Sequence, residues 1–172
     1  IAMPDAVLEQ SVPNIAESAF GNAGQRCLAG SVLTVVGEAR ERLLPKLVEH
    51  AETIKMGFGL DEGVTLGPVI RGEARDRVHR LVDEGLAAGA TMIRDGRGTG
   101  PSTGYFVGPT MLNIDEGSPL AREEVFGPVL SVLYAKDLDE ALRLMAETNE
   151  YGNAASIYTA SGSAAREFKR KA

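Results

Sequence analysis

Segments with helical periodicity alternate with short, apolar, β-rich runs along nearly the whole sequence. The first helical segment has apolar residues three and four positions apart, from Leu8 to Phe20, and the β-branched run Ser31–Val36 follows it. Such alternation is typical of a sheet whose strands are connected by helices that pack on its faces. The sequence therefore predicts an α/β fold: a layered, mostly parallel sheet with helices on both faces.

The same patterns place the remaining elements. Helices are predicted at Leu43–Ile54, at Ala74–Leu86, around Leu138–Met145 after a capping-box-like Asp137 and Glu140, and from Ser161 or Ser163 onward. Strands are predicted within Ala90–Gly96, Tyr105–Leu112, Val125–Ala135 and Ala155–Thr159. Three Gly-Pro pairs, at 67–68, 108–109 and 127–128, should mark strand starts or sheet edges, because proline cannot donate to a strand ladder.

Length and charge restrict the class of protein. The 172 residues are enough for one sizeable core, so we expect a single domain over residues 1–172. The net charge of −6 and the scattered basic residues argue against a nucleic acid partner. No apolar run is long enough to span a membrane, and the first residues carry no export signal, so a cytoplasmic location is expected.

The single cysteine, Cys27, is the most informative residue. It cannot form an internal disulfide, which favours a reducing environment and leaves two roles, a reactive thiol or a small buried hydrophobic side chain. Gly21 and Gly24 precede it and permit a tight bend between a helix and a strand. Such a bend can expose the sulfur, and neighbouring backbone N–H groups or Arg26 favour its thiolate form. The same N–H groups can stabilise an oxyanion on an attacked carbonyl carbon.

No metal site is predicted. His50 and His79 lie on helical patterns without a cysteine or paired carboxylates at ligand spacing, so we expect structural or surface roles for both.

Two motifs resemble those of the aldehyde dehydrogenase superfamily. "GNAGQRCLAGS" is similar to the segment that carries the superfamily's nucleophile, and "EEVFGPV", Glu123–Val129, is similar to its second signature. "MPDA", "LGPVI", "GYFVGPTML" and "YGNAASIYT" extend the resemblance over nearly the whole chain. The resemblance implies the fold of the superfamily's catalytic domain.

The resemblance also assigns roles to four residues. It implies that Cys27 is the nucleophile, which forms a thiohemiacetal and then a thioester with an aldehyde substrate. Glu124 matches the glutamate that binds the ribose beside the nicotinamide of NAD, with NADP as an alternative cofactor, and Phe126 matches the aromatic residue at the nicotinamide. Arg26 matches an arginine that holds a substrate carboxylate. Without the resemblance, the pattern indicates a solvated acidic pair at Glu123 and Glu124 and a core residue at Phe126. For Arg26 it indicates a surface residue or one in an intrachain salt bridge.

Within the superfamily, the chain is most similar to methylmalonate-semialdehyde dehydrogenases, which transfer the acyl group to coenzyme A. Hydrolytic semialdehyde or pyrroline-carboxylate-type enzymes remain alternatives, as does a noncatalytic scaffold or oligomerisation module. The superfamily's NAD-binding domain lies mostly before the matched segment. Since the sequence starts at Ile1 and its last helix stops while still periodic, we expect a part of a longer chain, inactive in isolation, that forms homo-oligomers.

Overall fold

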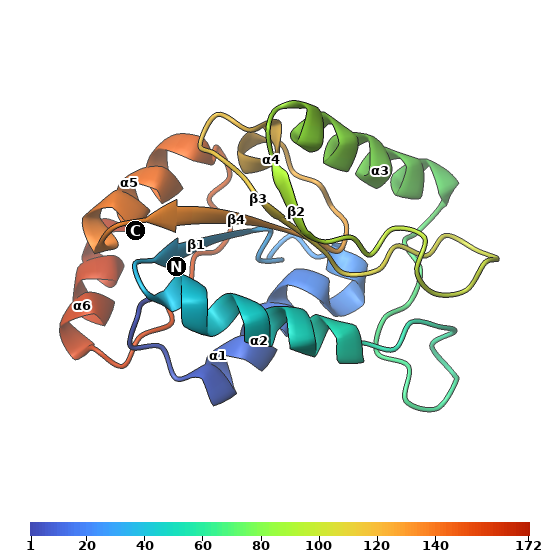
Figure 1. Cartoon of the computed structure of the whole chain (residues 1–172), viewed down its shortest axis with the longest axis horizontal. Helices are drawn as coiled ribbons and strands as arrows, with labels where there is room; N and C mark the ends of the chain where they lie inside the picture. Colours follow the sequence, from blue (N-terminus) through green and yellow to red (C-terminus); the bar gives the residue numbers. More distant parts are fainter.

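The computed structural model describes all residues, 1–172, as helices and short strands arranged around one sheet (Figure 1). The helices are α1 Leu8–Phe20, α2 Ala39–Thr53, α3 Gly72–Ala87, α4 Pro119–Arg122, α5 Leu138–Thr148 and α6 Gly162–Lys171. The strands are β1 Val32–Val36, β2 Thr91–Arg94, β3 Thr110–Asn113 and β4 Val129–Ala135. Each helix and strand predicted from periodicity is present, except the strand at Ala155–Thr159.

The sheet has the order β1-β4-β3-β2 and is mostly parallel, as the alternating pattern predicts. β4 pairs in parallel with both β1 and β3, whereas β2 joins β3 as an antiparallel edge strand. The first motif ends where β1 begins, and the second ends where β4 begins. Because these two strands are neighbours, the sheet brings the two motifs together.

Alternate side chains of each strand supply the two faces of the sheet. In β1, Leu33 and Val35 pack with α1 and α2, whereas Val32 points into the opposite cluster, beneath α3 and α4. Figure 1 shows α1 and α2 on one side of the sheet and α3 and α4 on the other. A third, smaller cluster packs α5 against the ends of β1 and β4. Helices therefore cover both faces, as predicted.

Helix starts and strand starts follow their predicted signals. Asp137 caps α5 by accepting a hydrogen bond from the Glu140 backbone N–H at 2.9 Å, and Ser161 caps α6 in the same manner. Pro109 and Pro128 stand directly before β3 and β4, where no ladder hydrogen bond is lost.

Two predicted strand positions are wrong. Within Ala155–Thr159, only Tyr158 forms a bridge, because its sole partner strand is the short segment around Ala2. Gly67-Pro68 starts no strand either: the segment forms only an isolated bridge between Met56 and Leu66. Proline at 68 has no N–H with which to extend that bridge into a ladder.

Candidate active site

The bend before Cys27 is left-handed. Asn22, Ala23 and Gly24 have φ values of 52°, 55° and 65° in succession, and we call the segment Gly21–Gly24 the left-handed turn. Glycine adopts this conformation freely, whereas Ala23 does so at a cost of roughly 1 kcal/mol. The Ala23 methyl group is buried in the core cluster beneath α3 and α4, which offsets that cost. The turn redirects the chain from the end of α1 toward β1.

Gly24 is the point at which the two motifs touch. A Cβ atom on Gly24 would lie 2.1 Å from the carbonyl oxygen of Gly127, a distance that no side chain can occupy. Glycine at position 24 therefore permits the backbone of the cysteine motif to lie directly against the backbone of the second signature.

The four residues that the resemblance singles out line one cleft. Cys27, Arg26, Glu124 and Phe126 surround it together with residues from the α5–α6 connection, and we call it the cysteine cleft. Cys27 is exposed to solvent rather than buried in the core. The alternative that the thiol is a small core side chain therefore does not describe this structure.

Some backbone groups around Cys27 form hydrogen bonds within the chain and others do not. The carbonyl oxygen of Cys27 accepts a hydrogen bond from Asn153 Nδ2 at 3.0 Å, which fastens the loop from the carbonyl side. The backbone N–H groups of Cys27 and Leu28 donate no hydrogen bond within the chain. Free N–H groups next to an exposed sulfur are suited to an oxyanion that forms when the sulfur attacks a carbonyl carbon.

Glu123 and Glu124 do not act as a pair of equivalent surface charges. Glu123 forms an ion pair with Arg77 at 3.0 Å, whereas the Glu124 carboxylate makes no hydrogen bond or ion pair within the chain. Both line the cysteine cleft. Glu124 is thus the carboxylate available to a hydroxyl-bearing ligand such as a ribose.

Phe126 has an unusual backbone and an unusual environment. Its φ of 53° is rare for a bulky residue, and its side chain is 42% exposed. A core phenylalanine would be neither strained nor exposed, so the core alternative is not the one observed. The ring instead presents an apolar surface in the cysteine cleft, and backbone strain of this kind occurs often at functional sites.

Arg26 also lines the cysteine cleft, but its guanidinium contacts the Glu17 backbone oxygen and carboxylate, the latter at 3.3 Å. The salt-bridge alternative therefore holds for this structure. The pair is largely exposed, so its ionic contribution is small and water competes for it. A role for Arg26 toward a substrate carboxylate stays a prediction.

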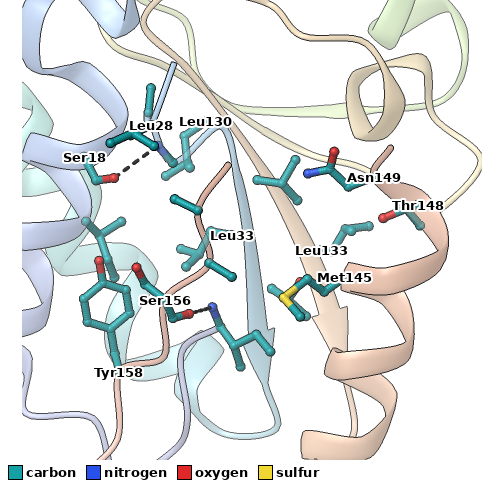
Figure 2. Close-up of a pocket in the computed structure, with 18 residues that line it drawn as sticks. Ser18, Leu28, Leu33, Leu130, Leu133, Met145, Thr148, Asn149, Ser156 and Tyr158 are labelled. Carbon is teal, nitrogen blue, oxygen red and sulfur yellow. Dashed lines mark hydrogen bonds between the residues drawn. The ribbon is translucent and has the colours of Figure 1, made fainter. Parts of the chain in front are cut away.

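An apolar cavity lies beside the cysteine cleft. Figure 2 shows its lining along β1, β4 and α5, which includes Leu33, Leu130, Leu133 and Met145. The cavity and the cysteine cleft share Leu28, Ala29, Val32, Asn149 and Ala154. At its edge, the Ser18 hydroxyl accepts a hydrogen bond from the Gly30 backbone N–H at 3.1 Å, which fixes the end of the cysteine loop to α1.

The structure gathers no group of three or more histidine, cysteine, aspartate or glutamate side chains that could hold a metal ion. None of its helices combines the length and the hydrophobicity required to cross a bilayer.

Asn153 and Arg77 contact the site but were not among the predicted residues. In the sequence, only the position of Asn153 in the "YGN" motif points to a role in the site. Arg77 bonds to the second signature from α3, and no local pattern connects positions that far apart in the sequence.

Fold and site together define a protein with an exposed cysteine on a strand-connecting bend beside a free carboxylate and an aromatic ring. The profile described as "Aldehyde dehydrogenase family" matches residues 1–172. The chain therefore belongs to the aldehyde dehydrogenase family.

Relatives with a named substrate are similar over the whole chain. Malonate-semialdehyde dehydrogenase 3 of Geobacillus kaustophilus is 44% identical over 99% of this chain and 36% of its own length. A crystal structure from Sinorhizobium meliloti 1021, described as a methylmalonate-semialdehyde dehydrogenase complexed with NAD, superposes with a TM-score of 0.94 at 39% identity, over 99% of this chain and 35% of that one. The crystal structure of methylmalonate-semialdehyde dehydrogenase from Oceanimonas doudoroffii superposes with a TM-score of 0.93 at 35% identity. The superposition covers 98% of this chain and 36% of that one. The chain thus spans about a third of the length of these relatives.

Proposed function

We propose that this chain is the nucleophile-bearing part of a longer NAD-dependent semialdehyde dehydrogenase. The observation that carries the proposal is the meeting of the exposed Cys27, the unpaired Glu124 carboxylate and the strained Phe126 in one cleft. Family membership and the NAD complex of a relative at 39% identity support the choice of cofactor.

The chain's residues suit the first chemical step. The Cys27 thiolate forms a bond to the aldehyde carbon, and the carbonyl π electrons move to oxygen, giving a thiohemiacetal oxyanion. The N–H groups of Cys27 and Leu28, which have no acceptor within the chain, would donate to that oxygen. The hydrogen bond from Asn153 keeps the peptide that follows Cys27 from rotating.

The cleft also fits the cofactor. Glu124 has both carboxylate oxygens free to accept hydrogen bonds from a ribose, and Phe126 offers a flat apolar surface to a ring. When bound, NAD supplies the acceptor for the hydride that leaves the thiohemiacetal carbon, and Cys27 then carries a thioester.

The finer proposal concerns substrate and acyl acceptor. We infer a malonate or methylmalonate semialdehyde as substrate, which agrees with the names of the relatives. Arg26 would then exchange Glu17 for the substrate carboxylate, a ligand whose two oxygens fit a guanidinium equally well. We further propose coenzyme A as the acceptor that takes the acyl group from Cys27 by thioester exchange. Homo-oligomer formation by the complete protein belongs to the same proposal.

Replacement of the nucleophile tests the proposed function. In the complete protein that carries this chain, Cys27→Ala should reduce semialdehyde oxidation by at least about 10³-fold, because the proposed covalent intermediate forms on the Cys27 sulfur. NAD affinity and the melting temperature, measured in parallel, should remain close to wild type.

Near-wild-type oxidation by Cys27→Ala would rule out this mechanism. A thiol that reacts with iodoacetamide only after unfolding would instead favour a noncatalytic scaffold. Product analysis with and without coenzyme A decides the acyl acceptor: a coenzyme A thioester supports the finer proposal, and free acid formed regardless of coenzyme A contradicts it.

A further inference from the structure

Helix α3 holds the second signature through one arginine. Arg77 Nη1 donates to the Val125 carbonyl at 2.6 Å, and Nη2 donates to the Glu124 carbonyl at 2.7 Å and to Glu123 Oε1 at 3.0 Å. Three successive residues of the signature are therefore bound to a single guanidinium. Its planar, rigid arrangement of donors fixes the orientation of the two peptide groups on either side of Val125, Glu124–Val125 and Val125–Phe126.

The next residue of the helix completes the support. A Cβ atom on Gly127 would lie 2.4 Å from Val78 Cγ2, so α3 packs directly against the signature on the far side of Phe126. Phe126, with its left-handed backbone, lies between the part held by Arg77 and the part packed on Val78. A strained residue persists only where its surroundings fix the backbone on both sides.

The other arginines of α3 are bound differently. Arg80 pairs with Glu84 one turn away, and Arg75 pairs with its neighbour Asp76. Such exposed pairs within one helix contribute little to stability. Arg77 alone donates to backbone carbonyls of another element, and those carbonyls lose their partners when it is removed.

We propose that Arg77 is a positioning residue for cofactor binding. By anchoring the Glu124 and Val125 carbonyls, it holds the Glu124 carboxylate and the Phe126 ring at the place where they meet the nicotinamide riboside. The inference rests on the proposed function, because it takes NAD as the ligand of those two residues. We expect removal of Arg77 to affect the Cys27 loop less than the second signature, since Asn153 and Ser18 fasten that loop independently of Arg77.

The complete protein and three variants separate this role from general support of the fold. Arg77→Met keeps a long side chain but removes all donors, Arg77→Lys keeps the positive charge on a single ammonium group, and Arg80→Met is the matched control on the same helix. Fluorescence titration gives the Kd for NAD, and steady-state kinetics shows whether a variant changes the KM for NAD or kcat. The rate of Cys27 alkylation by iodoacetamide is measured without NAD.

For Arg77→Met we expect a rise in Kd and KM for NAD of about tenfold or more, with an alkylation rate within about twofold of wild type. Arg80→Met should bind NAD within about twofold of wild type. Arg77→Lys, whose ammonium can serve one carbonyl well, should give an intermediate Kd and provides the test if the methionine variant does not fold.

NAD binding unchanged in Arg77→Met and Arg77→Lys would overturn the inference and leave the proposed function intact. The inference would also be overturned if Arg77→Met changed the rate of Cys27 alkylation as strongly as the Kd for NAD, because Arg77 would then support the whole site. A wild-type protein that does not bind NAD would instead overturn the proposed function, and the inference with it.

Discussion

At the scale of single residues, Asn153 connects Cys27 to a distant part of the chain. Its side chain donates to the Cys27 carbonyl from the α5–α6 connection, and both residues line the cysteine cleft. This hydrogen bond fixes the peptide whose N–H belongs to Leu28, one of the two free donors near the sulfur. Asn153 therefore acts on the proposed chemistry through the backbone, without contacting the reacting atoms.

Asn153→Leu preserves much of the side-chain volume and removes the donor. We expect kcat/KM of the complete protein to fall about fivefold, which corresponds to roughly 1 kcal/mol for one net hydrogen bond. The KM for NAD should change little, because the second signature is anchored by Arg77. Steady-state kinetics checks the prediction, with Asn14→Leu on the exposed face of α1 as the control. A loss confined to the KM for NAD would contradict it.

The sequence permits the prediction that Cys27, Arg26, Glu124 and Phe126 belong to one site, because each stands in a short motif with its own recognisable residues. All four residues line the cysteine cleft, and their chemical roles stay predictions. The contacts of Arg77 with Glu124 and of Arg26 with Glu17 could not be predicted. They depend on the docking of whole helices, and an arginine on a helix surface has the same local pattern whether it meets water or a carbonyl.

At the scale of elements, the left-handed turn and the second signature form one unit. Gly24 and Gly127 allow the two backbones to touch, and Val78 of α3 fills the space behind Gly127. The unit depends on backbone contact, for which side-chain rearrangement cannot compensate.

Gly24→Ala should therefore destabilise the chain by about 3 kcal/mol, the sum of a positive-φ penalty and a clash with rigid backbone. Gly59→Ala is the matched control, because a Cβ there meets nothing within 4 Å, and its effect should stay within about 0.5 kcal/mol. Urea unfolding of the 172-residue chain measures both. Equal stabilities for the two variants would show that the contact at Gly24 is readily relieved.

Most elements could be predicted because their side-chain periodicity reports which face is buried. The run Ala155–Thr159 has the composition of a strand, yet only Tyr158 is paired, since strand formation requires a neighbour and composition does not supply one. The short α4, Pro119–Arg122, is too brief to show any helical periodicity.

At the scale of the whole molecule, the loop between α2 and α3 exposes large apolar side chains. Phe58 is 65% exposed and Leu60 is 89% exposed, the latter the highest value among the large hydrophobic residues exposed in this chain. Exposed apolar side chains close together favour association with another surface. We therefore expect the 172-residue chain to associate weakly with itself and to use this loop for the contact.

The double variant Phe58→Ser with Leu60→Ser should raise the concentration needed for half-association by about tenfold, because two apolar side chains no longer leave water on contact. Light scattering over a concentration series measures this shift. Lys46→Ser with Glu49→Ser serves as the control, since it alters two exposed residues of α2 without changing the net charge. An unchanged concentration dependence would assign the association to another surface.

The hydrogen bond between Asn153 and Cys27 spans 126 residues of sequence. During synthesis, a ribosome that adds 5–20 residues per second needs roughly ten seconds to proceed from one to the other. For most of that interval the thiol belongs to a nascent chain that lacks β4, and throughout it the chain lacks Asn153. The surroundings of Cys27 are thus completed late in translation, and electrophiles or oxidants that meet the nascent chain before then encounter a cysteine outside its cleft.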